Sequence, residues 1–370
     1  MMKITYVIGQ LTVSGTELQL LELIRHLDPS QYQVTVISLY DQAPLADDLR
    51  ALGCTVRLLA REKRSRVAVF LDMFRELKNN RPDVVHGFAF AARPAMIIAK
   101  LLGIKGRVVS IRTFRPWKYR FLAWLDQIIL NLADTVLCNS YAAYHELSAS
   151  ITLKQTTSQV IYNGLDLQRF DQQFQQRPAG APPVVLDDEH PLTICCVGTL
   201  APVKNHDILL RAFKRVLATY PTAQLWLVGG GPNDQALTDL TRALELADHV
   251  VFWGQRTDVP SILRYVDLGV LASSREGMPN AVIEYLAAGL PVVATDVGGI
   301  RELVDSDAIG LLVPPNDMAA LADALLALLA DRDRARRMGQ RGRAKVEAEF
   351  AVEGMVSHME TIYRTLLESE

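Results

Sequence analysis

The sequence predicts an α/β protein with two mostly parallel sheets, each covered by helices. Three observations lead to this fold class. Short β-branched runs alternate with longer helical patterns along most of the chain, as in parallel sheets whose strands are joined by crossover helices. A proline-rich segment, 177–191, interrupts the alternation, which then resumes. The length of 370 residues suits two domains.

The first series contains the elements expected before the proline-rich segment. Its strands are expected at Lys3–Ile8, Gln33–Leu39, Cys54–Leu58, Asp83–His86, Arg107–Ile111, Asp134–Cys138 and Gln159–Tyr162. Its helices are expected at Thr16–Leu27, Val67–Asn80, Ala91–Leu102, Lys118–Leu132 and Tyr141–Ala149.

Segment 177–191 contains four prolines and the acidic run Asp187-Asp188-Glu189, a composition typical of an interdomain linker. We therefore expect one domain over 1–185 and a second over 186–350. Strands of the second domain are expected at Leu192–Val197, Gln224–Val228, Val250–Trp253, Asp267–Ala272, Val292–Ala294 and Leu311–Val313. The chain then becomes helical, at Ala319–Leu329, Arg334–Phe350 and Val352–Leu367.

Composition excludes several classes of protein. Hydrophobic residues make up 49% and charged residues 22%, and the net charge is -2, so we expect a globular enzyme with a large core and no nucleic-acid partner. The N-terminal segment is too short and too strand-like to be a signal peptide. No apolar run is long enough to span a bilayer. The cysteines show no metal-binding spacing, and we expect them to be buried and reduced. These features predict a cytoplasmic protein.

Ligands of open parallel sheets bind at the carboxyl ends of the strands, so the loops there are the candidates for a site. The first such loop leads into a helix at Gly15, where a ligand can approach backbone N–H groups. It lacks the G-x-G-x-x-G pattern, which disfavours a nicotinamide cofactor.

Three loops of the second series offer further candidates. Lys204 follows the first strand, where a lysine can balance charge on a leaving diphosphate. The turn Gly229-Gly230-Gly231 fits either tight packing or ligand contact. Arg256 follows the next strand and could reach a base or a phosphate.

The most informative stretch is 274–284. Pro279 and Asn280 are suited to the first turn of a helix, whose N–H groups can hold a diphosphate. Glu276 precedes that helix and Glu284 lies within it. Two carboxylates on either side of a helix start can accept hydrogen bonds from hydroxyls of a nucleotide sugar, although two ordinary surface glutamates would give the same spacing.

Together these loops resemble glycosyltransferase family 4, whose members are retaining, nucleotide-sugar-dependent enzymes with the GT-B fold. The resemblance covers almost the whole chain. It is strongest over 197–213, 225–232 and 250–304, which include "VGTLAPVKNHDILL" and "SSREGMPNAVIEYLAAGLPVVATDVGG". Segments 14–27, 82–86 and 160–170 are similar too.

The resemblance implies two Rossmann-like domains that face each other across a cleft, and a final segment, 351–370, that returns to the first domain. It implies that Glu284 binds the ribose, that Glu276 contacts the donor sugar and that Lys204 binds the diphosphate. Backbone donors would come from Gly15 and from Gly277, Met278, Pro279, Asn280 and Ala281. The reaction would need neither a metal nor another cofactor.

Two positions depart from the family pattern. Thr199 stands where the family often has arginine, so Lys204 would hold the phosphates alone or with Arg112 or Arg256. His86 lies close to the family's active-site histidine region, but Gly87 and Phe88 follow it in place of a second histidine. The resemblance therefore leaves a catalytic role for His86 open.

The leading hypothesis is retaining transfer of a hexose-type sugar to a hydroxyl by a metal-independent, front-face route. UDP is the expected nucleotide, with GDP next, and the product would be a surface polysaccharide, glycolipid or glycoside. The alternatives are a nucleotide-sugar 2-epimerase and a non-catalytic nucleotide-sugar-binding protein. The acceptor, a glycan or a lipid-linked sugar, would bind the first domain near Arg112 and Arg115. The basic runs 57–66 and 107–121 also fit peripheral contact with an anionic membrane.

Overall fold

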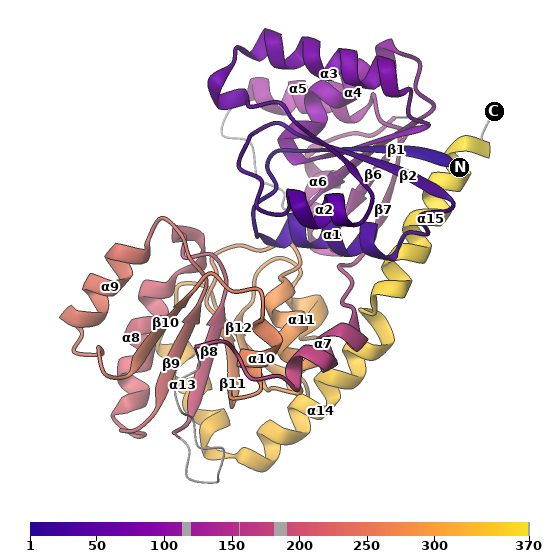
Figure 1. Ribbon diagram of the computed structural model, residues 1–370. Helices are drawn as coiled ribbons and strands as arrows, with labels where there is room; N and C mark the ends of the chain where they lie inside the picture. The colour runs from indigo at the N-terminus through magenta and orange to yellow at the C-terminus, as the bar shows by residue number, and fades with distance from the viewer. Residues whose placement is uncertain (113–119, 155, 181–190, 369–370) are drawn as a thin grey trace. The chain divides into compact units, whose positions relative to one another are not determined.

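The computed structural model describes residues 1–112, 120–154, 156–180 and 191–368 (Figure 1). The chain forms two compact units. The first contains Met1–Gly164 together with Val352–Glu370, and the second contains Leu165–Ala351. The chain passes from the first unit to the second at residue 164, before the boundary expected at 185. Most of the expected linker, 181–190, lies outside the described residues.

The first unit is built on a seven-stranded sheet in the order β3-β2-β1-β4-β5-β6-β7, in which every pair of neighbours is parallel. The strands are β1 (Met2–Ile8), β2 (Tyr32–Ser38), β3 (Thr55–Leu58), β4 (Val84–Phe88), β5 (Gly106–Ile111), β6 (Thr135–Cys138) and β7 (Thr157–Val160). The helices are α1 (Gly15–His26), α2 (Ala46–Ala51), η1 (Arg61–Lys63), α3 (Arg66–Asn80), η2 (Ala89–Ala91), α4 (Ala92–Leu101), α5 (Arg120–Leu130), α6 (Tyr141–Ser150) and α15 (Val352–Glu368).

Both faces of this sheet are apolar, because alternate residues of each central strand enter two different cores. Ile4, Tyr6 and Ile8 of β1 pack with α1, α2 and α15, whereas Val7 packs on the opposite face with α3, α4, α5 and α6. A parallel sheet covered on both faces has this pattern. Helices α3, α4 and α5 lie side by side over one face (Figure 1).

The second unit has a six-stranded sheet in the order β10-β9-β8-β11-β12-β13, again with parallel pairs. Its strands are β8 (Thr193–Val197), β9 (Gln224–Val228), β10 (Val250–Gly254), β11 (Leu268–Leu271), β12 (Val292–Thr295) and β13 (Gly310–Val313). Its helices are α7 (Leu167–Phe174), η3 (Pro202–Lys204), α8 (His206–Leu217), α9 (Asp234–Ala243), α10 (Val259–Leu263), α11 (Asn280–Ala287), α12 (Ile300–Leu303), α13 (Met318–Ala330) and α14 (Arg332–Glu349).

Helix α7 explains why the boundary precedes the proline-rich segment. Its backbone carbonyl at Gln173 accepts a hydrogen bond from Ser261 of α10, at 2.7 Å. Its Asp171 receives both terminal nitrogens of Arg343 of α14, at 2.7 and 2.8 Å. These contacts fix α7 to the second unit, although its sequence lies in the expected first domain.

The expected fold class is confirmed, with two parallel-sheet, Rossmann-like units and a final helix, α15, that belongs to the first. All thirteen expected strands are present. Strand β7 begins at Thr157 rather than Gln159. The four cysteines are free and buried. Among the described residues, no helix has both the length and the apolar character that crossing a membrane requires.

Candidate functional site

Each sheet has one point where the chain order reverses. In the second unit this point lies between β8 and β11, because the strands that follow β8 are added on one side and those that follow β11 on the other. Loops at the carboxyl ends of two such strands form the usual ligand site of an open α/β sheet. The loop after β8 contains Lys204, and the loop after β11 contains Glu276.

These two loops bring their charged residues into contact. Lys204 Nζ lies 2.5 Å from Glu276 Oε1, and their side chains are only 20% and 10% exposed. The Ser273 hydroxyl donates to the same Oε1 at 2.6 Å. The loops are also joined by their backbones, since Ser274 N–H donates to the Val203 carbonyl at 2.8 Å. A partly desolvated carboxylate is therefore held between a cation and a hydroxyl.

The loop after β12 supports the backbone of Glu276. Gly298 has φ +54°, and a β-carbon at this position would lie 1.9 Å from the Glu276 carbonyl oxygen. Gly299 N–H donates to the Gly277 carbonyl at 2.7 Å. Thr295, at the end of β12, donates its hydroxyl to the Ser273 carbonyl at 2.6 Å. This third loop thus fixes the position from which the Glu276 side chain projects.

The glycine turn after β9 is explained by packing. A β-carbon at Gly229, where φ is +149°, would lie 2.0 Å from the Gly198 carbonyl oxygen. Leu200 N–H donates to the Gly230 carbonyl at 3.1 Å. Of the two interpretations that the sequence left open, close packing of this turn on the Lys204 loop is the one that these contacts support.

Helix α11 begins at Asn280 with Pro279 as its N-cap, within one residue of the expected start. Its Tyr285 is completely buried and anchors the helix to the switch-point strand, because the Val197 N–H of β8 donates to the Tyr285 hydroxyl at 2.6 Å. Glu284, the preceding residue, is half-buried. Desolvation raises the pKa of its carboxyl to about 7.

The remaining candidates of the second unit differ in their surroundings. Gly277, Met278 and Pro279 are buried, Asn280 and Ala281 are half-buried, and Thr199 is exposed on the Lys204 loop. Arg256 is held by Asp258, with Nε–Oδ1 2.8 Å and Nη2–Oδ2 2.6 Å. It also donates to the Ala179 carbonyl and lies over the Trp253 ring. These contacts hold Arg256 against Asp258 of its own loop and against Ala179 of the segment after α7.

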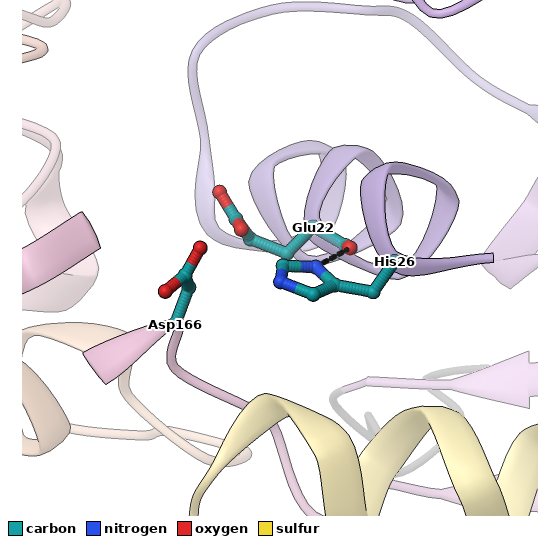
Figure 2. Close-up of side chains that lie close together, drawn as sticks. All are labelled: Glu22, His26 and Asp166. Atoms are coloured by element: carbon teal, nitrogen blue, oxygen red, sulfur yellow. Dashed lines mark hydrogen bonds between the residues drawn. The ribbon is translucent and has the colours of Figure 1, made fainter. Parts of the chain in front are cut away.

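In the first unit, Gly15 is exposed at the first position of α1. Ser14 is the N-cap, and its hydroxyl donates to the carboxylate of buried Glu17. Burial raises the pKa of that carboxyl. Toward the end of the helix, His26 Nδ1 lies 2.9 Å from the Glu22 carbonyl oxygen, one turn earlier (Figure 2). Gly15 therefore starts a helix whose first turn is fixed by its own side chains.

His86 lies in the core of the first unit and is 0% exposed. Its Nδ1 is 2.8 Å from the Tyr363 hydroxyl of α15, and its Nε2 is 2.8 Å from the Ser110 hydroxyl of β5. Burial and the nearby Arg112 lower the pKa of the imidazole to about 3. A neutral, enclosed ring with both nitrogens engaged joins α15 to the sheet, and it has no exposed edge for a substrate. The catalytic part expected for His86 does not fit this environment.

Arg112 is half-buried at the end of β5. It donates to the Asn163 side chain and lies over the Phe88 ring, 6.0 Å from its centroid. Burial lowers the pKa of its guanidinium to about 10, while the neighbouring Glu17 acts in the opposite direction. Arg115 and the rest of segment 113–119 of the basic run 107–121 lie outside the described residues.

The sequence reasoning missed the residues that support the site. Ser273, Tyr285 and Gly298 contact Glu276 or the strand beside it, but none belongs to a charge pattern or a recognisable spacing. The signal available for Gly298 was the pair Gly298-Gly299 in the loop that follows a short β-branched strand, which resembles the other glycine-bearing loops that follow strands.

Comparison with known proteins agrees with this architecture. Residues 13–169 match the model of the family described as Glycosyltransferase Family 4. Residues 182–345 match the family described as Glycosyl transferases group 1. The two matches fall on successive halves of the chain.

Curated relatives of this chain are named as sugar transferases or as a glucosaminyl synthase. The chain is 34% identical to N-acetyl-alpha-D-glucosaminyl L-malate synthase of Bacillus anthracis, over 45% of this chain and 44% of that protein. It is 29% identical to the lipopolysaccharide core biosynthesis mannosyltransferase LpsB of Rhizobium meliloti, over 74% of this chain and 76% of that protein. It thus spans under half of the first relative and about three quarters of the second.

Solved structures share the fold at low sequence identity. HepE of Anabaena in complex with UDP-glucose superposes with a TM-score of 0.79, at 20% identity over 100% of both chains. Sucrose-phosphate synthase from Thermosynechococcus elongatus gives a TM-score of 0.81, at 21% identity over 100% of both chains.

Proposed function

The chain belongs to glycosyltransferase family 4, and from this premise we propose that it transfers a hexose-type sugar from a nucleotide sugar to a hydroxyl group. UDP is the proposed nucleotide, with GDP as the alternative. The HepE structures hold UDP or UDP-glucose, and LpsB is named for lipopolysaccharide core synthesis. By analogy, we propose that the product is a polysaccharide, a glycolipid or a related glycoside.

The observation that carries this proposal is the contact of Lys204 with Glu276 at the switch point of the second sheet. In the proposed complex, Lys204 turns to the diphosphate and Glu276 accepts a hydrogen bond from a sugar hydroxyl. The first N–H groups of α11 face the phosphates, and Glu284 accepts hydrogen bonds from the ribose. Each group then meets an atom of complementary charge or hydrogen-bonding type.

The proposed chemistry retains the configuration of the anomeric carbon. The bond from this carbon to the diphosphate oxygen breaks, and the acceptor oxygen forms its bond on the same face. The leaving phosphate oxygen takes the acceptor proton. Lys204 and the start of α11 stabilise the negative charge on the diphosphate, so we propose that neither a metal nor another cofactor takes part. Because Thr199 stands at the usual arginine position, Lys204 carries this task without that arginine.

The donor is tested by thermal shift and by hydrolysis of UDP-, GDP- and ADP-sugars. We expect one nucleotide class to stabilise the protein and to be hydrolysed slowly without an acceptor. Stabilisation by none of them would contradict the proposal. Formation of an epimer from the donor alone would replace it with the nucleotide-sugar 2-epimerase alternative, and binding with neither transfer nor hydrolysis would favour a non-catalytic protein.

The residues are tested by Lys204→Ala and Glu276→Ala, with Lys214→Ala and Glu245→Ala as matched controls. The control residues form an exposed ion pair in the same unit. We expect the first two variants to fold and to lose most transfer activity, by about 100-fold or more, as for loss of transition-state charge stabilisation. The controls should stay within twofold of wild type. Wild-type turnover by Lys204→Ala or Glu276→Ala would remove that residue from the mechanism.

We further propose peripheral contact with an anionic membrane, in keeping with a lipid-linked acceptor. The basic run 57–66 and exposed apolar residues of the first unit support it. Sedimentation with vesicles that contain or lack anionic lipid is the test. Equal absence of binding to both kinds of vesicle would contradict this contact.

A further inference from the structure

A groove of about 460 Å³ in the first unit is lined by apolar residues and three arginines. Phe70 and Met73 of α3 and Phe90 of η2 are among its apolar lining residues, and the arginines are Arg61, Arg66 and Arg93. The volume lies within the roughly 300–1,000 Å³ of small-molecule sites. Every lining residue belongs to the first unit.

The three arginines differ in how their charge is balanced. Arg93 is neutralised by buried Asp126, at 2.7 and 2.9 Å. Arg61 lies over the rings of Tyr40 and Phe90, 5.5 and 6.0 Å from their centroids. Within the part of the chain that the structure describes, neither Arg61 nor Arg66 has an acidic partner.

The neighbouring cations of the same run are compensated. Lys63 pairs with Asp41, and Arg64 pairs with Asp72. The two uncompensated charges of the run 61–66 are therefore the two that line the groove. A groove with two guanidinium groups that have no acidic partner among the described residues complements an anion, because arginine binds phosphate oxygens with paired N–H donors.

Part of the apolar lining of the groove is exposed. Phe90 is 46% exposed, and Phe70 of α3 is half-buried. Large apolar side chains that gather at one exposed place mark a contact site more often than scattered ones do. An apolar lining beside two arginines complements a hydrocarbon chain attached to an anionic group.

The groove adjoins the switch point of the first sheet. Phe90 follows β4, and its ring packs so close to Gly9, directly after β1, that a β-carbon at Gly9 would lie 2.6 Å from it. Strands β1 and β4 are the neighbours between which the chain order reverses. Ligands of open α/β sheets bind beside this point.

We propose that this groove binds the phosphate and the first part of the hydrocarbon chain of a lipid-phosphate acceptor, with Arg61 and Arg66 on the phosphate and Phe70 and Phe90 along the chain. The assignment of this lipid phosphate as the acceptor rests on the proposed transferase function. The binding of an alkyl phosphate does not depend on it.

The test is calorimetric titration of the full-length protein, without donor, with decyl phosphate below its micelle concentration. Inorganic phosphate and the neutral decyl glucoside are the comparison ligands. Arg61→Glu and Arg66→Glu are the test variants, and Arg64→Glu, which changes the same charge in the same run outside the groove lining, is the matched control. Thermal unfolding of each variant shows whether it is folded. Arg66→Gln, a milder substitution, shows whether loss of the charge alone weakens binding.

We expect decyl phosphate to bind at least tenfold more tightly than either comparison ligand. Arg61→Glu and Arg66→Glu should weaken it by tenfold or more, Arg66→Gln by a smaller factor, and Arg64→Glu by less than twofold. Equal affinity for decyl glucoside or for inorganic phosphate would overturn the proposal, as would an equal effect of Arg64→Glu. Binding to phosphatidylglycerol vesicles without binding of decyl phosphate would overturn it in favour of a membrane surface.

This experiment separates the groove from the transferase assignment. Binding of decyl phosphate by a protein that turns over no nucleotide sugar would leave the groove in place and contradict the proposed function. Turnover of a nucleotide sugar by a protein that does not bind decyl phosphate would contradict the groove alone.

Discussion

The Glu276 carboxylate receives two partners on one oxygen, the Lys204 ammonium and the Ser273 hydroxyl. If Lys204 moves to a diphosphate, Ser273 is the side chain that still holds Glu276 in place. A hydrogen bond to a charged group contributes about 1.5–3 kcal/mol. In the proposed complex we therefore expect Ser273 to be a positioning residue, which acts on the donor sugar through Glu276.

We predict that Ser273→Ala lowers kcat/KM for the donor by about 10- to 100-fold, corresponding to that hydrogen bond, with a smaller change in stability. Ser273→Thr, which keeps the hydroxyl, should recover much of the loss. Ser274→Ala is the matched control, because the Ser274 hydroxyl donates to the Val203 carbonyl and not to Glu276. Steady-state kinetics with varied donor measures the effect, and equal losses in Ser273→Ala and Ser274→Ala would argue against positioning.

Glu284 gives a prediction for pH. Desolvation raises the pKa of its carboxyl from 4.5 to about 7, so in the unliganded protein much of it is protonated at pH 6. In the proposed complex Glu284 faces the ribose, and the anion accepts hydrogen bonds from ribose hydroxyls more readily than the acid does. The donor KM should therefore fall as pH rises from 6 to 8, and Glu284→Gln should remove that change.

The effect of rising pH on the stability of the protein has the opposite sign. A carboxyl with a raised pKa holds its proton more tightly in the folded state, so its contribution to the free energy of unfolding decreases as pH rises from 4.5 to about 7. Glu245→Gln, at an exposed side chain of the same unit, is the control for both measurements. A pH dependence of KM that persists unchanged in Glu284→Gln would assign it to another group.

At the scale of elements, the loop after β12 acts as a support for the loop after β11. Gly298 makes this contact possible, since it has φ +54° and its α-carbon faces the Glu276 carbonyl. Alanine at this position would add a steric clash to the cost of a left-handed backbone. Gly289 offers a matched case, with φ +71° and no atom within 4 Å of a built β-carbon.

We predict that Gly298→Ala and Gly289→Ala both lose about 1 kcal/mol of stability from the left-handed backbone. Only Gly298→Ala should also lower transfer, by tenfold or more, because the clash displaces Glu276. Thermal unfolding and donor kinetics on both variants are the measurements. Equal activity of the two variants would mean that the Glu276 loop tolerates the shift.

The strands were predictable because each is a short β-branched run between loop residues, and a parallel sheet covered on both faces needs such runs. Helix α7 was not assigned, because its attachment to Ser261 and Arg343 depends on residues far away in the sequence. The role of Ser273 was not predicted either, because its contact with Glu276 follows from the folded loop and not from a sequence pattern. The positions of Lys204 and Glu276 in loops at the carboxyl ends of strands predicted both as candidates for a site, but their direct contact could not be predicted, since 72 residues separate them.

The whole molecule consists of two units, and the first is completed by α15. Val352, Met355, Val356, Met359, Ile362 and Tyr363 of this helix are buried in its core. Each side chain of this kind contributes about 1.5–3 kcal/mol when fully buried. Their sum is comparable to the whole stability of a typical domain, about 5–15 kcal/mol.

We predict that a chain ending at Ala351 loses the fold of the first unit and keeps that of the second. Hydrogen exchange with peptide-level mass spectrometry tests this, because peptides of β1 and β4 should exchange rapidly while those of β8 and β11 stay protected. The full-length chain is the control. Equal protection of β1 in both proteins would show that the first sheet is stable without α15.

The position of α15 also determines the order in which the chain can fold while it is being made. Residues 1–164 leave the ribosome first, but their core lacks its last helix until residues 352–368 follow. At about 5–20 residues per second, this delay lasts roughly 10–40 s for the intervening 187 residues, counted from 165 to 351. The second unit can close during that interval. The half of the protein that is synthesised first is therefore the last to become complete, and its apolar surface is the one that a chaperone would meet.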